Sequence, residues 1–334
     1  MKVLLTGGLG FIGHNVVRDL ERMGHECIVI DSTTNYDFIP EPEISFLMKE
    51  RRARIKAKIF YLDIRSGLEV KTLFRHFNPD VVIHLASFPR QKVVLKNPIV
   101  GCDVMMNGLI TLLEASTLVR LKKFVYISSS MVYGDFKNNV RESALCKPIG
   151  QYGILKYTGE KIVEEYTRQG HFDHIIIRPS AVYGEHDVND RVVSKFIIGA
   201  MKGETLQING PNEILDFTHV SDVSKGIALV STSKGKITRN QIYNITRSSK
   251  KTCTIEKAAQ LIINIVGSGA YDTNGNPNVF QYNEPDINFP TRGRLNIAKA
   301  QKDFRYNPKI DIEEGFRQYY EWIRSSDYWR LQLL

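Results

Sequence analysis

The sequence predicts an α/β fold built on a doubly wound parallel sheet. Short apolar runs alternate with amphipathic stretches through the first half of the chain, and a glycine-rich turn joins the first run to the first stretch. Strands buried on both faces have short runs rich in Val and Ile, and strand–helix alternation with right-handed crossovers gives a parallel sheet. The expected strands are Val3–Leu5, Cys27–Ile30, Lys58–Tyr61, Val81–His84, Phe124–Ile127 and His174–Ile177.

The helical patterns lie between these strands. They cover roughly Phe11–Met23, Leu68–His76, Pro98–Val119 and Tyr152–Thr167. The segment 33–56 is longer than an ordinary connection, so we predict an insertion there, with a helix near Ile44–Ile55.

The alternation loosens after about residue 180, where polar stretches rich in Pro and Gly interrupt short helices. These stretches are Gly184–Asp190, Asn209–Glu213, Asp272–Asn278 and Asn283–Gly293. A strand near Gln241–Ile245 and a helix over Val220–Ser231 are expected to return to the main sheet. We therefore predict a first domain of residues 1–180, joined by 215–248, and a smaller C-terminal lobe of residues 181–214 and 249–334.

Composition limits the class of protein. The chain has 334 residues, 43% of them hydrophobic, which is ample for a folded core. Its four cysteines lie far apart, so we expect a reducing compartment, no disulfide framework and no metal site. The first apolar run is short and interrupted by glycine, unlike a signal peptide, and no stretch approaches the roughly 20 apolar residues of a membrane span. We expect a soluble, cytoplasmic protein with no membrane partner.

The formal net charge is +9, and part of it lies in the run Lys49–Lys58. One interpretation is a patch that binds nucleic acid, and the other is a solvated helix face. No interleaved aromatic residues or nucleic-acid motif accompany the run, so we favour the solvated face and expect no nucleic-acid partner.

The segment Thr6–Gly13 reads TGGLGFIG and lies between a predicted strand and a predicted helix. Glycine permits a tight turn and lets the backbone approach a pyrophosphate, which the N–H groups of the helix N-terminus then bind. Asp31 ends the second strand, where a carboxylate accepts hydrogen bonds from ribose hydroxyls and repels a 2′-phosphate. These features predict a Rossmann-type domain that binds NAD rather than NADP. The cofactor-binding residues expected here are Gly7, Gly10, Phe11, Ile12, Gly13 and Asp31, with Asp63 and Ile64 after the third strand at the adenine.

Tyr152 and Lys156 are one helical turn apart, so their side chains lie on one face. An ammonium near a phenol favours the phenolate, and moving a tyrosine pKa from about 10 to near 7 requires roughly 4 kcal/mol. Lys156 together with a nicotinium charge could supply this, making Tyr152 a general base. Ser128–Ser130 ends the strand Phe124–Ile127, at the sheet edge where ligands bind.

In this order, the motifs resemble the extended short-chain dehydrogenase/reductase family, the NAD-dependent sugar epimerases and dehydratases. The resemblance covers nearly the whole chain. The motifs that carry it are TGGLGFIG, Asp31, His84–Ser87 (HLAS), Ile127–Gly134 (ISSSMVYG), Tyr152–Lys156 (YGILK), Arg178–Gly184 (RPSAVYG), Asp216–Asp222 (DFTHVSD) and Pro308 to Gly315.

The resemblance implies roles for individual residues. Tyr152 would be the base, Lys156 its modulator and a nicotinamide-ribose contact, and Ser129 a hydroxyl relay. Leu85 and Ala86 would contact the cofactor. The C-terminal lobe would bind the substrate, a nucleotide sugar, with Ser87, Ser130 and the position of Ala181 at the sugar. The implied mechanism is transient oxidation of a sugar hydroxyl by NAD, with the protein positioning and polarising the substrate.

Several positions depart from the family pattern. Related 4,6-dehydratases carry an acidic pair just after the catalytic Ser/Thr, and here Ser130 and Met131 stand there, which disfavours dehydration. Ala181 replaces a substrate-binding Asn, and Leu215 replaces an Arg that binds the diphosphate. The position of an Asn that kinks the helix after the fourth strand holds Met105, with Asn107 two residues on. The arginines that could replace the missing diphosphate contact are Arg191, Arg292 and Arg294.

Arg90 and Lys92 follow the fourth strand and face the expected sugar site. They could bind a uronate carboxylate or a phosphate, or they could be ordinary loop charges. Three histidines, His14, His84 and His219, are candidates for a catalytic acid or base, but we expect them to have structural roles instead.

The leading hypothesis is C4 epimerisation of a UDP-hexose through a transient 4-keto intermediate. A 4,6-dehydratase or 4-keto reductase of the same family is the second, and a binding module without turnover is the third. The predicted helices Pro98–Val119 and Tyr152–Thr167 carry apolar residues beyond one stripe: Met105, Met106, Ile110, Ile162 and Val163. In the family these helices form a two-fold interface, so we expect a homodimer, although deeper burial within one chain would explain the same residues.

Overall fold

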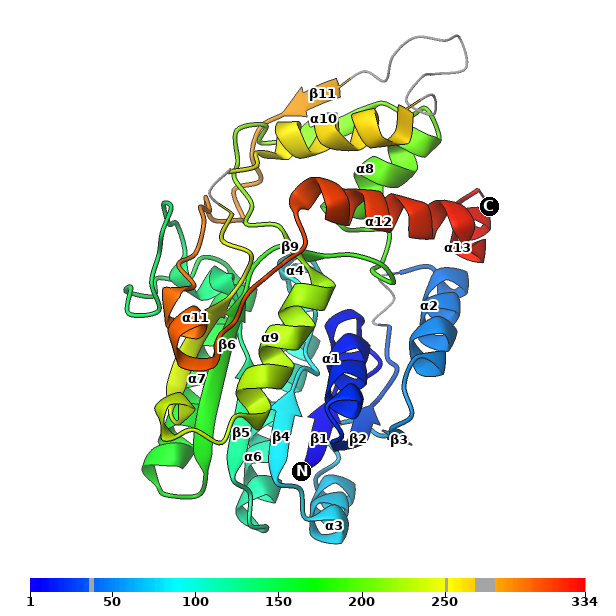
Figure 1. The fold of residues 1–334 in the computed structure, drawn as a ribbon. Helices are drawn as coiled ribbons and strands as arrows, with labels where there is room; N and C mark the ends of the chain where they lie inside the picture. Colours follow the sequence, from blue (N-terminus) through cyan, green and yellow to red (C-terminus); the bar gives the residue numbers. More distant parts are fainter. Residues whose placement is uncertain (36–38, 250–251, 268–279, 334) are drawn as a thin grey trace.

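The computed structural model describes residues 1–35, 39–249, 252–267 and 280–333. Its centre is a seven-stranded parallel sheet in the order β10-β6-β5-β4-β1-β2-β3 (Figure 1). The chain order reverses between β1 and β4, which creates a crevice at the carboxyl ends of these strands. The strands are β1 Lys2–Thr6, β2 Glu26–Asp31, β3 Lys58–Tyr61, β4 Val81–His84, β5 Lys123–Ile127, β6 Asp173–Pro179 and β10 Gln241–Ile245.

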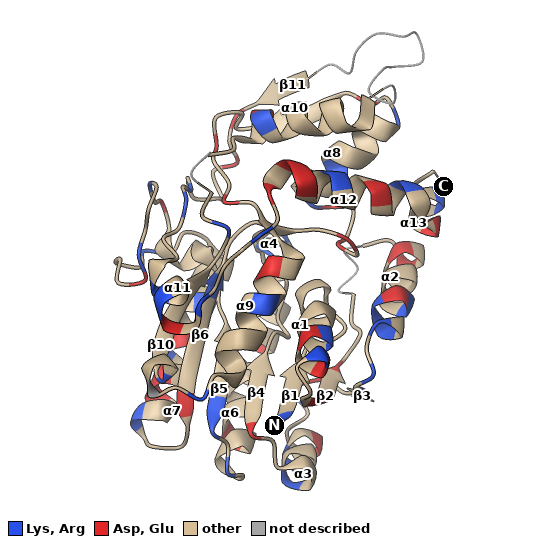
Figure 2. Cartoon of the chain, viewed as in Figure 1, with Lys and Arg blue, Asp and Glu red and all other residues tan. Residues whose placement is uncertain are grey.

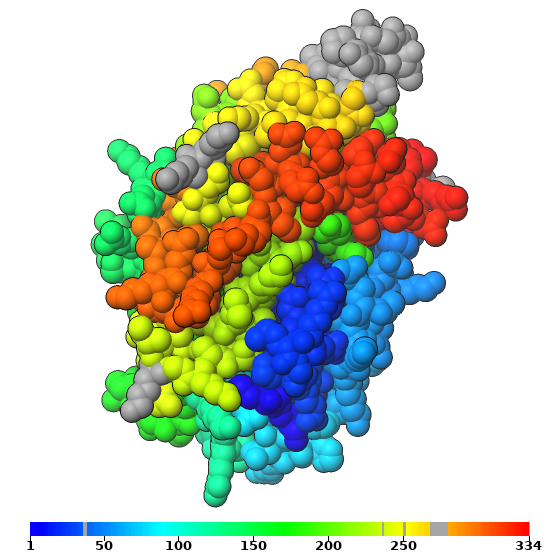
Figure 3. Space-filling view, viewed as in Figure 1, coloured from blue at the N-terminus to red at the C-terminus, as the bar shows by residue number. Residues whose placement is uncertain are grey.

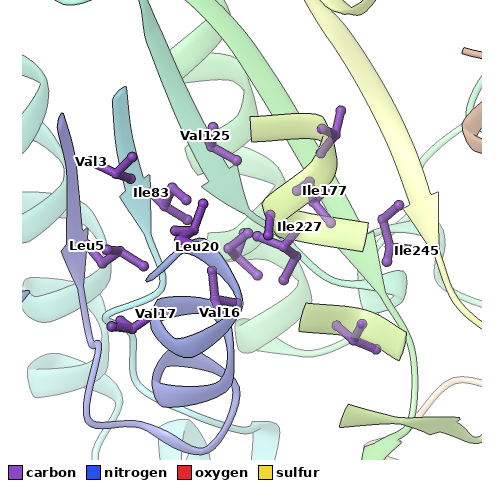
Figure 4. Close-up of a cluster of buried hydrophobic side chains, with 14 of the residues drawn as sticks. Val3, Leu5, Val16, Val17, Leu20, Ile83, Val125, Ile177, Ile227 and Ile245 are labelled. Atoms are coloured by element: carbon purple, nitrogen blue, oxygen red, sulfur yellow. The ribbon is translucent and has the colours of Figure 1, made fainter. Parts of the chain in front are cut away.

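Helices cover both faces of the sheet, as the doubly wound prediction requires. Alternate residues of β1 show why, because Val3 and Leu5 join one buried cluster while Leu4 joins another. On the first face, α1 (Phe11–Arg22) and α9 (Val220–Thr232) pack against the sheet and against each other (Figure 4). On the second face lie α3 Gly67–Phe77, α6 Gly108–Thr117 and α7 Gln151–Arg168.

The predicted helix Pro98–Val119 is not regular. It consists of α5 (Pro98–Cys102), one turn of π-helix (Asp103–Asn107) and α6. The π turn covers the segment where the family helix is kinked, and Ile64 packs against Gly108 just beyond it.

The helical span Pro98–Thr117 is, by length and composition, long and apolar enough to cross a membrane, and half of it is buried inside the protein. The expectation that no stretch has this length was therefore wrong. Core helices of soluble proteins share these properties, and α6 packs against both α3 and α7.

The predicted insertion contains α2 (Glu41–Ala53). This helix contacts both α1, near the N-terminus, and the last helix of the chain. α2 packs beside the C-terminal helix α13 (Asp327–Gln332), and Figure 3 shows the C-terminal segment lying next to it. Acidic residues occupy the first turn of α2 and basic residues its last turn (Figure 2), which suits the helix dipole.

Elements after residue 180 build a second apolar cluster beyond the carboxyl edge of the sheet. β10 joins β6 in the main sheet, as expected. The division into residues 1–180 with 215–248 and a lobe of residues 181–214 and 249–334 stays a proposal. The predicted loop Asp272–Asn278 lies outside the described residues. The remaining elements are α4 Gln91–Lys96, β7 Val182–Tyr183, α8 Val192–Met201, β8 Leu206–Asn209, β9 Thr218–His219, α10 Ile255–Val266, β11 Phe280–Asn283, α11 Ala298–Phe304 and α12 Ile312–Ser325, with short 3₁₀ turns at Ser130–Tyr133 and Lys236–Thr238.

Candidate active site

A single cavity of about 650 Å³ opens at the carboxyl edge of the sheet and extends under the C-terminal lobe. With the exception of Arg294, the residues predicted for cofactor, catalysis and substrate line it, although they come from segments far apart in the sequence. They are Gly7, Gly10, Phe11, Ile12, Gly13, Asp31, Asp63, Ile64, Leu85, Ala86, Ser87, Arg90, Lys92, Ser129, Ser130, Tyr152, Lys156, Ala181, Arg191 and Arg292.

The turn between β1 and α1 has the geometry of a phosphate cradle. Gly7 has φ +71°, and a Cβ there would lie 2.6 Å from the backbone nitrogen of Ala86. A Cβ on Gly13 would overlap the carbonyl oxygen of Gly7. Gly10 caps α1 without a side-chain hydrogen bond, so the N–H groups of the first helical turn have no acceptor from the helix or its cap, and Phe11, Ile12 and Gly13 of this turn line the cavity. The turn therefore fits a dinucleotide pyrophosphate.

Asp31 lies at the end of β2, beside this turn. Its carboxylate accepts hydrogen bonds from the N–H of Leu9 at 2.8 Å and from the N–H of Thr33 at 2.9 Å. Burial raises the pKa of Asp31, and these two N–H groups and nearby Arg51 oppose the rise. A carboxylate has about four acceptor sites, so it can still accept from ribose hydroxyls.

Asp63 and Ile64, which are predicted to lie at the adenine, both line the cavity. Both carboxylate oxygens of Asp63 accept from the guanidinium of Arg65, which also donates to Asp103 at 2.5 Å. Hydrogen bonds from Arg65 hold the pKa of Asp63 below its usual range. This ion pair positions the wall of the site, a feature that the sequence did not indicate.

Tyr152 and Lys156 both project from α7 into the cavity. The Lys156 ammonium lies 5.9 Å from the centre of the Tyr152 ring and donates to the carbonyl of Ile127 at 2.8 Å. Ser129, two residues beyond that carbonyl, also lines the cavity and lies close enough to Tyr152 to oppose the rise in its pKa. These contacts bring together the three predicted catalytic side chains.

Burial dominates the electrostatics of the Tyr152–Lys156 pair. Burial raises the pKa of Tyr152, and the opposing contributions come from Arg191 and from Ser129, not from Lys156. Burial also lowers the pKa of Lys156 to about 7, partly offset by Glu160. The ammonium is itself disfavoured at this depth. The prediction that Lys156 and a nicotinium charge together favour the phenolate concerns the NAD-bound protein and stays a prediction.

A buried ion pair supports this arrangement. Arg178 donates to both carboxylate oxygens of Glu160, at 2.9 and 2.5 Å, and both side chains are almost fully buried. Ser128 donates to the same carboxylate at 2.5 Å. Glu160 is one turn beyond Lys156 on α7, so the contacts from Arg178 of β6 and from Ser128 after β5 fix both strand ends against the helix that carries the catalytic residues.

The lobe side of the cavity is rich in cations. Arg90 is paired with Asp190 at 2.8 Å, while Lys92 is exposed at the rim. Arg191 lies 3.5 Å from Asp187 and donates to the carbonyl of Val182. Arg90, Lys92 and Arg191 all line the cavity, on the side where a substrate phosphate is expected.

Arg292 is the least compensated of these cations. Burial, followed by the neighbouring charge of Arg191, lowers the pKa of Arg292 to about 10, and Glu213 opposes this. The Nε atom of Arg292 is buried without a partner. Arg294, the other candidate, does not line the cavity and donates to the carbonyl of Ser249. Two neighbouring guanidinium groups in one cavity, those of Arg191 and Arg292, suit a diphosphate.

Three departures from the family pattern meet in the same region. Ala181 has φ +40°, a left-handed conformation that Asn tolerates far better than Ala. Leu215 forms part of an apolar wall, and Ser130 donates to Ser180 at 3.1 Å. The two residues after Ser129 are Ser130 and the buried Met131, so neither position carries a carboxyl group.

The three histidines lie outside the cavity lining. His84 bonds to Thr6 at 2.7 Å, and burial lowers its pKa to about 3, so it is neutral. His219 lies 3.2 Å from Glu185, and burial holds the pKa of His14 well below its usual value. Among the described residues no cluster of His, Cys, Asp and Glu could hold a metal ion.

Sequence reasoning missed several buried polar residues that line the cavity, among them Arg51 and Gln91. Arg51 lies inside the basic run and donates to the carbonyls of His186 and Leu9, so it joins the lobe to the phosphate turn. Its spacing from Leu47, one turn earlier on α2, was the available signal that it faces inward. The neighbouring Arg52 and Lys49 are exposed, as a solvated face predicts.

Comparison with known proteins agrees with this geometry. A model of the NAD-dependent epimerase/dehydratase family matches residues 3–246. The chain belongs to this family. Its members use NAD, and structural neighbours have been solved with NAD bound, which fits the phosphate turn and Asp31.

Individual family members show how far the likeness extends. A UDP-glucuronate 4-epimerase of Thermodesulfobacterium geofontis is 24% identical, covering 97% of this chain and 96% of that protein. A Thermotoga maritima UDP-glucose 4-epimerase, solved with UDP-glucose, superposes with a TM-score of 0.84 at 27% identity over 97% of this chain and 99% of that one. A Bacillus cereus UDP-glucuronic acid 4-epimerase, solved with its sugar nucleotide and NAD, has a TM-score of 0.85 at 24% identity over 97% and 99% of the two chains, and supports the fold.

Proposed function

We propose that this protein is an NAD-dependent epimerase that inverts C4 of a UDP-hexose through a transient 4-keto intermediate. The observation that carries the proposal is the meeting of Ser129, Tyr152 and Lys156 in the cavity that also contains the phosphate turn. A base and a hydroxyl relay beside a dinucleotide site are the groups that carbinol oxidation requires.

The proposed roles follow from the contacts. Tyr152, as phenolate, accepts the proton of the C4 hydroxyl, and Ser129 shares a hydrogen bond with the same oxygen. Lys156, anchored on the carbonyl of Ile127, donates to the nicotinamide ribose and stabilises the phenolate when it carries charge. NAD would accept a hydride from C4 of the sugar and return it to the same carbon. The positive charge of Arg191, which already opposes the rise in the pKa of Tyr152, assists ionisation.

Epimerisation is favoured over dehydration by the residues after Ser129. Expelling water from the sugar requires an acid and a base at that point, whereas Ser130 is bonded to Ser180 and Met131 is an apolar buried side chain. Neither side chain is an acid or base that titrates near neutral pH. A 4-keto sugar held in this cavity therefore has reduction as its remaining outcome.

The residues proposed to bind the substrate lie on the side of the cavity that faces the C-terminal lobe. Arg191 and Arg292 would bind the diphosphate that Leu215 cannot contact, and Ser87, Ser130 and the backbone at Ala181 would face the sugar. Because Arg90 is paired with Asp190, Lys92 is the better candidate for a sugar carboxylate. A UDP-linked sugar is proposed because the epimerases similar to this chain are named for UDP-glucose and UDP-glucuronate.

We also propose a cytoplasmic homodimer. Met105 and Val163 are buried within the chain, so deeper burial explains those two residues. Ile110 on α6 and Ile154 on α7 remain 39% and 49% exposed, and Ile99 on α5 is 83% exposed. An apolar face of this kind suits contact with a second copy. Sedimentation at micromolar concentration tests this, and a monomer would contradict it.

The test of the function is NMR observation of sugar signals with UDP-glucose, UDP-N-acetylglucosamine and UDP-glucuronate. Interconversion of one C4 epimer pair, lost in Tyr152→Phe, is expected. A stable 4-keto product would indicate a dehydratase, and net consumption of added NADH or NADPH a reductase. NAD binding with no exchange on any sugar would leave the non-catalytic binding module.

A further inference from the structure

Gln91 is a buried amide that belongs to the cavity wall but has no role in the mechanism above. It is the first residue of α4, on the segment that follows β4, and only 2% of it is exposed. Burying a primary amide costs free energy unless its polar atoms are bonded. The hydrogen bond that its side-chain oxygen accepts shows which backbone group Gln91 satisfies.

The oxygen of the Gln91 side chain accepts the backbone N–H of Tyr152 at 3.0 Å. Tyr152 is the second residue of α7, so its N–H has no acceptor within the helix. The helix cap, Gly150, cannot supply one, because it has no side chain. Gln91 therefore caps α7 from another segment of the chain, directly at the proposed base.

The space around Gly150 is shaped to admit this amide. Gly150 has φ +76°, and a Cβ there would overlap the Nε2 atom of Gln91 and lie 2.6 Å from its Cδ. The Nε2 atom is buried without a partner. The acceptor contact with Tyr152 is therefore the one polar interaction that orients the side chain among the described residues.

The neighbouring residue extends the connection across the cavity. Arg90 pairs with Asp190, which also pairs with Lys195 of α8 at 2.6 Å. Asp190 precedes Arg191, the cation that opposes the rise in the pKa of Tyr152. The adjacent residues Arg90 and Gln91 thus join one cavity wall to the segment that carries the base and to the segment that carries Arg191.

We propose that Gln91 is a positioning residue that fixes Tyr152 through its main-chain N–H. The proposal rests on the proposed function for its catalytic consequence, but the contact itself is testable without turnover. Removing the acceptor frees the first turn of α7, and a small displacement of a reacting group lowers the rate without weakening substrate binding equally.

Three variants separate positioning from general damage. Gln91→Leu removes the acceptor at similar volume. Gln91→Glu keeps an acceptor and places a carboxylate at a helix N-terminus, where it is favoured. Gln169→Leu is the matched control, since Gln169 is the exposed C-cap of the same helix.

Amide exchange of Tyr152 in the NAD-bound protein is the first measurement. Gln91→Leu should exchange at least about tenfold faster, the scale of one lost hydrogen bond, while Gln91→Glu and Gln169→Leu should match the wild type. Unchanged exchange in Gln91→Leu would overturn the contact.

Kinetics on the active sugar nucleotide are the second measurement. We expect kcat to fall about tenfold in Gln91→Leu, with KM and NAD affinity within about twofold, and to recover in Gln91→Glu. Equal loss in both variants, or no loss in either, would overturn the positioning role. If the wild type turns over no sugar nucleotide, the proposed function fails, while the exchange measurement still decides the contact.

Discussion

Replacing Lys156 by Met should make the protein more stable while destroying its activity. Methionine has a similar length and no charge, so it removes a buried ammonium that donates a hydrogen bond to the carbonyl of Ile127. Burial lowers the pKa of this ammonium from 10.5 to about 7, which corresponds to about 5 kcal/mol of cost to the charged form. Loss of the charged hydrogen bond returns about 1.5–3 kcal/mol of that. We expect a net gain of roughly 2–3 kcal/mol in the free energy of unfolding at pH 7.

The pH dependence gives the sign of this effect. Between pH 7 and 10.5 the unfolded state keeps the Lys156 proton while the folded state releases it, so wild-type stability rises with pH in this window. The variant lacks this rise. Its advantage should therefore shrink by about 2–3 kcal/mol between pH 7 and pH 9.

Urea unfolding of the NAD-free protein, followed by circular dichroism at both pH values, measures the difference. Lys161→Met is the control, because Lys161 lies on the same helix with its side chain 51% exposed, and its replacement should change stability little at either pH. A variant that is less stable than wild type at pH 7, or a gain of equal size at pH 9, would refute the reasoning.

Three further predictions concern the cofactor and substrate sites. Gly13→Ala should weaken NAD binding at least about 100-fold in a titration, because its Cβ would overlap the Gly7 carbonyl, whereas Gly235→Ala, whose Cβ would come no closer than 3.5 Å to another residue, should not; equal affinities would contradict the cradle. Asp31→Ala should raise the affinity for NADP relative to NAD by at least about tenfold in competition binding, since the carboxylate that repels a 2′-phosphate is gone, and an unchanged ratio would place the ribose elsewhere. Ala181→Gly should increase the free energy of unfolding by about 0.5–1 kcal/mol, because φ +40° is strained for Ala, and a loss of stability in chemical denaturation would show that the strain is absent.

Much of this site was predictable because its signals are local. The glycine turn, Asp31 and the Tyr152–Lys156 spacing each depend on a few consecutive residues or on one helical turn, and backbone geometry fixes their relative placement. The strand pattern then brings them together, because the carboxyl ends of parallel strands share one edge.

The parts that sequence did not predict depend on contacts between distant segments. Gln91 meets Tyr152 only because α4 packs on α7, and Arg51 reaches the carbonyls of His186 and Leu9 only when α2 lies beside the lobe. Arg65 and Asp190 neutralise groups that the sequence left open as ligands. The low pKa of Lys156 arises from burial depth, which spacing on a helix does not reveal.

The central claim is that C4 of the sugar is oxidised and then reduced within one closed site. A sugar nucleotide that proves active, labelled with deuterium at C4 and converted in ordinary water, tests this directly. We predict that the epimer retains the label at C4, because the same hydrogen leaves and returns without contact with solvent, and that Tyr152→Phe forms no product. An epimer that carries hydrogen at C4, or undiminished conversion by Tyr152→Phe, would contradict the account.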